Sequence, residues 1–313
     1  MFIVKHRKIF YSISVILVIS SVLLIVLWGL KPSIDFTGGS LLDISFSGSK
    51  PTAEEVSGVL NSLNFKDVSV RSSGEGFILR LKEISQAEKD SILQNLSLSG
   101  KYSPTEKTFS TIGPILSKEA MQKAWISIVL VLSAIVLFIT FAFRKVSKPV
   151  SSWIYGIVTV LALLHDILVP TGIFALLGHF YGFEVDTLFV TALLVILGFS
   201  VHDTIVVFDR VRENLHKNEN YGGRKPAQLA SGEAGAGGDF ETVVGESISE
   251  TFVRSINTSL TVLLAILVLY LFGPETIKNF TLVLLIGIFI GTYSSIFIGS
   301  TLLVTINNWK RYA

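Results

Sequence analysis

Six long apolar runs restrict the fold of this chain more than any other feature of its sequence. A helix rises about 1.5 Å per residue, so about 20 apolar residues cross a hydrocarbon layer about 30 Å thick. Each of the six runs is long enough to do so. They cover approximately residues 9–30, 123–143, 151–177, 186–208, 253–272 and 280–305. We therefore expect an α-helical membrane protein with six transmembrane helices.

The composition agrees with a chain that lies mostly in a membrane. Half of the 313 residues are hydrophobic and 16% are charged, whereas a soluble domain carries about 25% charged residues. A net charge of +2 gives no reason to expect nucleic acid as a partner. The sequence has no cysteine, which excludes disulfides and cysteine-based metal or thiol chemistry.

The amino terminus and the basic residues predict how the chain crosses the membrane. The first run follows a basic start like that of a signal peptide, but it is about twice too long and no cleavage pattern follows, so we expect an uncleaved helix. Basic residues cluster on one side, and the short connections 179–184 and 274–279 on the other side offer only Lys278. Both termini are then cytoplasmic and residues 31–120 lie outside. The clustered residues are Lys5, Arg7, Lys8, Arg144, Lys145, Lys148, Arg210, Arg212, Lys217, Arg224, Lys225, Lys310 and Arg311.

The segment between the first two runs has the pattern of a small folded domain. Alternating strand patterns and capping boxes, Thr52 with Glu55 and Ser85 with Glu88, give the order β-α-β-β-α-β. This order predicts an α+β, ferredoxin-like domain. The strands are "SLLDISFS", "DVSVRS", "GFILRLKE" and "KTFSTIG", and the helices are "TAEEVSGVLNSL" and "SQAEKDSILQNL".

The runs divide the chain into five parts. A glycine-rich insert, 219–241, has six glycines between Gly222 and Gly238 and predicts a flexible segment, either natural or engineered. The parts are 1–30 (cytoplasmic start and first helix), 31–120 (outside domain), 121–208 (helices two to four), 209–250 (cytoplasmic loop) and 251–313 (helices five and six with the cytoplasmic end).

An aspartate inside the fourth run, in "LGFSVHDTIVVFDRVREN", is the first candidate functional residue. Asp203 lies about five residues from the end of the run, roughly 7–8 Å inside the boundary. Ser200, Asp203 and Thr204 share one face, so the carboxyl should face the interior of the bundle. A buried carboxyl that is neutral or charged according to its neighbours has the basic property of a proton carrier. The alternative is a structural carboxyl capped by hydroxyls.

The fifth run offers a counter-charge. Arg254, Asn257, Thr258 and Thr261 form a stripe at positions 0, 3, 4 and 7, entering the membrane at a depth comparable to that of Asp203. An arginine that approached and left the carboxylate would act as a proton gate. In the alternative, Glu250 pairs with Arg254 near the surface.

A second His-Asp pair, His165 and Asp166, lies in the third run. With His202 and Asp203 it raises the idea of a metal site. However, consecutive helical residues diverge by about 100°, so each pair can aim one good ligand at a shared ion, and no His-x-x-x-His or Glu-x-x-His spacing is present. We predict no metal and no cofactor.

Two further patterns suggest packing and a turn. Gly287, Gly291, Ser295 and Gly299 recur every four residues and form a ridge for close helix packing, and "GTYSS" adds hydroxyls that can bond across it. In "DFTGG", which is Asp35, Phe36, Thr37, Gly38 and Gly39, the glycines suit either a hinge or a strand-entry turn.

Several of these motifs together resemble the SecF branch of the SecD/SecF family. They are "DFTGGSLLDISF", "ALLHDILV", "GFSVHDTIVVFDRVREN", "SINTSLTVLL" and "GTYSSIFI", in this order from the first run to the last. Weaker similarity extends to resistance–nodulation–division transporters. The resemblance implies a transporter-like bundle in the bacterial cytoplasmic (inner) membrane.

The resemblance also implies a function. The chain would be a non-enzymatic, auxiliary subunit of the Sec translocase that uses the proton motive force to assist export of unfolded preproteins. The family's proton-transport acid and arginine match Asp203 and Arg254, while family members often carry Asn at the position of His202. Supporting residues of the proton path would be His165, Asp166, Ser200, Thr204, Asn257 and Thr258. The expected partners are SecD, the SecYEG translocon, YajC, preproteins and the lipid bilayer.

Two alternatives from other classes remain open on sequence grounds. A free-standing proton-coupled exporter of small or lipid molecules would need a second core half and a substrate-sized cleft. An intramembrane metallohydrolase would use the His-Asp pairs, and stoichiometric zinc or iron in the purified protein would favour it.

Overall fold

The computed structural model describes residues 2–65, 68–98, 100–144, 151–220 and 238–312. They divide into two compact units. The helical unit comprises 1–30, 127–183 and 188–313, and the small unit comprises 31–126 and 184–187. The sequence did not indicate that residues 184–187, which connect two membrane helices, belong to the small unit.

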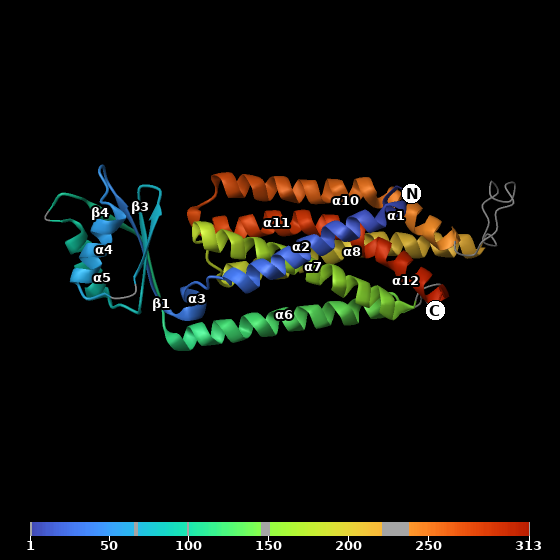
Figure 1. Cartoon of the computed structure of the whole chain (residues 1–313), viewed down its shortest axis with the longest axis horizontal. Helices are drawn as coiled ribbons and strands as arrows, with labels where there is room; N and C mark the ends of the chain where they lie inside the picture. The colour runs from blue at the N-terminus through green and yellow to red at the C-terminus, as the bar shows by residue number, and fades with distance from the viewer. Residues whose placement is uncertain (1, 66–67, 99, 145–150, 221–237, 313) are drawn as a thin grey trace. The chain divides into compact units, whose positions relative to one another are not determined.

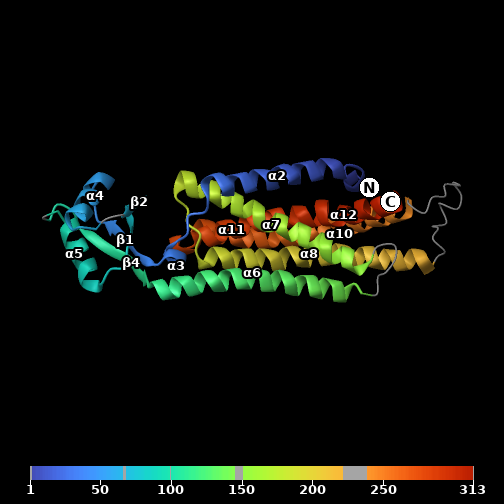
Figure 2. The same ribbon diagram turned by 60° about the horizontal axis from the view of Figure 1, so that its bottom comes forward.

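The six predicted membrane spans are present, and the fold class predicted from the sequence is confirmed. The helices of the helical unit run lengthwise beside one another, and both termini lie at the same end of this unit (Figures 1 and 2). The elements are α1 (Phe2–Lys5), α2 (Arg7–Trp28), α6 (Pro114–Ala142), α7 (Ser152–Tyr181), α8 (Thr187–Asn220), α10 (Gly238–Phe272), η1 (Glu275–Ile277), α11 (Lys278–Ser294), η2 (Ser295–Gly299) and α12 (Ser300–Tyr312).

Two helices extend beyond their predicted ends into the predicted loop 209–250. α8 continues to Asn220 and α10 begins at Gly238. Charged side chains accompany the extension. Lys217 bonds Glu213 at 2.7 Å one turn earlier in α8, and such pairs support exposed helices. Arg210 of α8 bonds Glu250 of α10 at 2.6 Å and so joins the two helices. Most of the predicted insert 219–241 lies outside the described residues.

The helical unit has a buried core of three spans. The buried share is 50% in α7, 50% in α8 and 61% in the span formed by α11, η2 and α12, against 11% or less in α2, α6 and α10. Large apolar side chains on the outer helices therefore face outward, as expected where lipid or another membrane protein covers them.

Gly172 permits a close crossing of α7 with α2, which the sequence did not predict. A Cβ on Gly172 of α7 would stand 2.5 Å from the Cα of Ser21 on α2. Carbon atoms normally pack at about 3.5–4.0 Å, so a side chain here would separate the helices.

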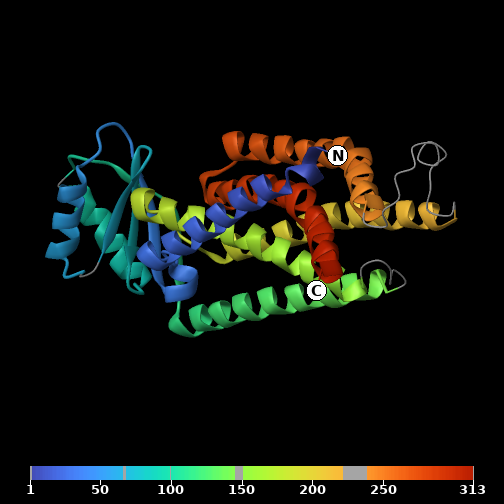
Figure 3. The same cartoon turned by 45° about the vertical axis from the view of Figure 1, so that its right-hand side comes forward.

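The small unit has the predicted ferredoxin-like order. Its four strands form an antiparallel sheet in the order β2-β3-β1-β4, and α4 and α5 cover one face (Figure 3). Leu42, Ile44 and Leu79 alternate inward to fill the core, and both predicted capping boxes are present. The elements are α3 (Ile34–Thr37), β1 (Gly39–Phe46), α4 (Ala53–Ser62), β2 (Ser69–Ser73), β3 (Gly76–Leu81), α5 (Gln86–Leu96) and β4 (Pro104–Ile112).

The "DFTGG" segment is a tight turn into β1. Gly38 and Gly39 have φ angles of +73° and +118°, and a Cβ on Gly39 would stand 2.5 Å from the carbonyl oxygen of Leu81. Glycine is the residue that adopts such angles without strain. The geometry is that of a turn, and movement about it stays a prediction.

Candidate functional site

Asp203 lies inside the bundle, where a hydroxyl of α10 bonds it and a hydroxyl of α11 bonds that hydroxyl in turn. It is 1% exposed, and Ser259 of α10 donates a hydrogen bond to its Oδ2 at 3.1 Å. Thr292 of α11 in turn donates to Ser259 at 2.8 Å. The side chain of the neighbouring His202 is 68% exposed. The carboxyl thus joins three helices through a short chain of hydroxyls.

Asp166 is a second buried carboxyl, on α7, and it is 0% exposed. Its Oδ2 accepts hydrogen bonds from Ser200 at 2.5 Å and from Ser294 at 2.7 Å. Its Oδ1 lies 3.0 Å from Nδ1 of His165. Polar groups this deep in a membrane protein need such partners, because an unpaired charge costs several kcal/mol there, of the order of 3.

The "GTYSS" hydroxyls bond across the contact between the sixth span and α8. Ser295 lies 3.0 Å from the Thr204 hydroxyl and donates to the carbonyl oxygen of Ser200 at 3.1 Å. The helix changes to a π-helix over Ser295–Gly299, a local form often found at functional sites. No sequence pattern had indicated this π-helix.

The predicted small-residue ridge lies against α8. A Cβ on Gly287 would meet Ile196, one on Gly291 would stand 3.2 Å from the Cβ of Ser200, and one on Gly299 would stand 3.8 Å from Thr204. The contacted residues are also four apart, so two ridges of matching period meet. This close approach brings the Ser294 hydroxyl of the sixth span within hydrogen-bond distance of Asp166.

The structure does not form the expected pair of Asp203 with Arg254. Arg254, Asn257 and Thr258 are exposed on the outer side of α10. Ser255 and Ser259 face inward instead, because one position along a helix is a rotation of about 100°. The alternative pair with Glu250 is not formed either, since Glu250 bonds Arg210 at 2.6 Å. The sequence reasoning missed Ser259, although Thr251, Ser255 and Ser259 recur every four residues.

In the small unit, the "DFTGG" segment forms hydrogen bonds with the connection between α7 and α8. Asp35 Oδ2 accepts from the backbone N–H of Thr187 at 2.9 Å and from its hydroxyl at 2.6 Å. Arg80 of β3 bonds Glu184 at 3.1 Å and the Thr37 hydroxyl at 2.6 Å. Burial raises the pKa of Glu184, and the Arg80 charge partly offsets this. Asp35 is thus an acceptor at the first residue of α8, the helix that carries Asp203.

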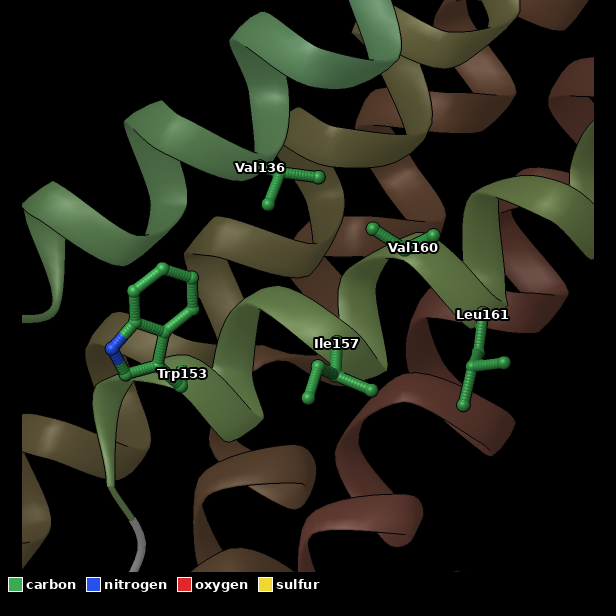
Figure 4. Close-up of a pocket in the computed structure, with 5 residues that line it drawn as sticks. All are labelled: Val136, Trp153, Ile157, Val160 and Leu161. Atoms are coloured by element: carbon green, nitrogen blue, oxygen red, sulfur yellow. The ribbon is translucent and has the colours of Figure 1, made fainter.

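No metal cluster marks a different site among the residues that the structure describes. Within the described ranges, no group of three or more histidine and carboxylate side chains could hold an ion. His165 is buried, whereas His202 is mostly exposed, with its Nδ1 3.8 Å from Asp203 Oδ1. Figure 4 shows a pocket between α6 and α7 lined by five side chains, none of them titratable. They are Val136, Trp153, Ile157, Val160 and Leu161.

Six membrane spans with buried carboxyls, and a ferredoxin-like unit between the first and second, define a multi-pass membrane protein of the transporter-like class. Residues 94–309 match the family described as "Protein export membrane protein SecD/SecF, C-terminal". The chain is 42% identical to "Protein translocase subunit SecF" of Thermobaculum terrenum, over 98% of this chain and 94% of that protein. It is 37% identical to the subunit of the same name from Anaerolinea thermophila, over 96% and 92%.

A solved structure shows the same architecture. The crystal structure of SecDF, a translocon-associated membrane protein from Thermus thermophilus, superposes with a TM-score of 0.77 at 28% identity. The match covers 98% of this chain but 38% of that one. The chain therefore belongs to the SecD/SecF family, as a SecF-type subunit of protein export. This membership confirms the resemblance.

Proposed function

We propose that the chain uses the proton motive force to assist export of unfolded preproteins across the bacterial cytoplasmic membrane, with both termini cytoplasmic. The observation that carries this proposal is the buried Asp203, which bonds Ser259 and through it Thr292. A titratable group that joins three membrane helices can couple a proton to their arrangement. The subunit itself performs no bond chemistry.

The exposed position of Arg254 supports the proposal that a second membrane protein contacts this face of α10. It makes no ion pair with another described residue, and it faces outward beside Asn257 and Thr258. A charge directed at lipid inside the hydrocarbon layer is unfavourable, so a membrane protein should cover this face. We propose SecD in that place, supplying a carboxylate to Arg254. SecYEG, YajC and the preprotein are further proposed partners.

The proposed cycle follows from the hydrogen bonds. A proton from outside neutralises Asp203, which weakens its attraction for the Ser259 hydroxyl, and α8 and α10 then change their packing. The proton leaves to the cytoplasm and the contact forms again. One charge moving through 100 mV supplies about 2.3 kcal/mol, enough to shift a two-state equilibrium about 50-fold.

The test is Asp203→Asn in vesicles that contain the chain with SecD and the translocon. We expect loss of proton-gradient-stimulated translocation at normal expression. His202→Gln is the matched control, since it replaces the neighbouring ring, which is 68% exposed and has Nδ1 3.8 Å from Asp203 Oδ1, while the carboxyl itself is kept. Stimulation that survives Asp203→Asn unchanged would refute the proton role. Arg254→Lys separates charge from shape, because loss of stimulation with charge retained would indicate guanidinium geometry.

A further inference from the structure

His165 and Asp166 form a buried pair that the proposed function does not use. Nδ1 of His165 lies 3.0 Å from Asp166 Oδ1. The other ring nitrogen, Nε2, is buried and has no hydrogen-bond partner among the described residues. An imidazole that donates from Nδ1 to a carboxylate carries its proton there, which leaves Nε2 with a free lone pair.

The carboxylate of this pair is held by donors from two other helices. Ser200 of α8 and Ser294 of the sixth span both donate to Asp166 Oδ2. With His165 donating from Nδ1, three donors surround one carboxylate, and a carboxylate in this place stabilises a positive charge on the adjacent ring. Ser294 also lies 3.0 Å from the carbonyl oxygen of Gly291, so its hydroxyl has a second acceptor.

This pair is separate from the Asp203 contacts. Asp203 bonds α10 through Ser259, whereas Asp166 bonds α8 and the sixth span. The titratable neighbour of His165 from the sixth span is Tyr293, whose ring centre is 6.3 Å away. The Tyr293 hydroxyl donates to a carbonyl oxygen of α2 at 3.0 Å. The described contacts place no further charged side chain on the imidazole.

From this geometry we propose that His165 is a second proton-transfer residue of this subunit, with Nε2 as the atom that takes up the proton. A water-borne proton adds to Nε2, Asp166 stabilises the imidazolium, and the proton leaves from the same nitrogen. Asp166 is the positioning residue, because it holds the ring with Nε2 free. The inference rests on the proposed function, since it assigns a further step to the same proton path.

The direct test observes the imidazole itself, in the full-length chain labelled with ¹⁵N-histidine in lipid nanodiscs. The chain has five histidines, and His165→Gln identifies the signal of interest. As pH is lowered, we expect the unprotonated Nε2 signal to give way to that of an imidazolium. Asp166→Asn should change the ring tautomer or its titration, and Asp203→Asn should leave both as they are.

A His165 ring that keeps Nε2 unprotonated over the whole pH range in which the protein stays folded would overturn the inference. A tautomer and titration that do not change in Asp166→Asn would overturn the positioning role. This measurement also needs no export activity, so it stands even where a variant assembles poorly.

The functional test uses vesicles with SecD and the translocon and compares three variants. His165→Gln and Asp203→Asn should each lower proton-gradient stimulation more than about tenfold, and His202→Gln should keep it. Stimulation lost only in Asp203→Asn would contradict the His165 role and leave the proposed function standing. Stimulation retained in both would contradict the proposed function itself.

Discussion

The crossing of α2 and α7 allows a quantitative test of packing, through Gly172→Ala. The new Cβ would stand 2.5 Å from the Cα of Ser21, so the two helices must separate by about 1–1.5 Å to restore normal contact. Backbone atoms cannot turn aside as a flexible side chain can. Overpacking of this kind costs about 1–3 kcal/mol, and we expect a value in the upper half of this range.

Gly198→Ala is the matched control, because a Cβ at Gly198 of α8 has no atom within 4 Å. Both changes gain the same helix propensity, about 1 kcal/mol, which cancels when the two variants are compared. The difference in their free energies of unfolding is then the steric cost alone. Reversible unfolding in mixed detergent micelles, followed by helical circular dichroism, measures it.

Alanine substitutions at the ridge glycines should have steric costs between those at Gly172 and Gly198. At Gly287 the new Cβ meets the flexible end of Ile196, so we expect a cost of about 1–2 kcal/mol. At Gly291 the nearest atom, the Cβ of Ser200, is 3.2 Å away, and we expect less than about 1 kcal/mol. Equal stability of the Gly172 and Gly198 variants would refute this reasoning.

Three smaller predictions concern single hydrogen bonds. Ser259→Ala removes a donor to Asp203 and should lower the free energy of unfolding by about 1–3 kcal/mol; an unchanged unfolding titration would show that the carboxyl finds another donor. Asp35→Ala removes the acceptor at Thr187 and should speed amide hydrogen exchange in the first turn of α8. Protection equal to that of the wild type would show that Asp35 does not stabilise this turn. Backbone hydrogen bonding at the start of α4 lowers the pKa of Glu55 below its ordinary 4.5, so its stabilisation is present above pH 4.5 and lost in acid. Amide hydrogen exchange in α4, corrected for the intrinsic exchange rate, should therefore become faster below that pH. Glu55→Gln should remove this acid sensitivity. An equal acid response in the wild type and in Glu55→Gln would exclude Glu55 as its source.

Much of the fold could be predicted because its signals are local. The six spans follow from the length of each apolar run, and the strand and helix order of the small unit follows from alternation and capping boxes. The inward face of Ser200, Asp203 and Thr204 also follows from helix periodicity, and all three are buried. The loop 209–250 was predicted too long, because both flanking helices continue into it, with an ion pair on neighbouring turns of α8 and another between α8 and α10.

The sequence by itself determined that a carboxyl lies within the fourth span and faces the bundle, because burial and periodicity are properties of one helix. Only the tertiary structure decided that Ser259, and not Arg254, meets it. That choice depends on how α10 is rotated, where one residue corresponds to about 100°, and every contact along the helix contributes to the rotation. The donors around Asp166 and the π-helix beside them arise in the same way, from the packing of three helices together.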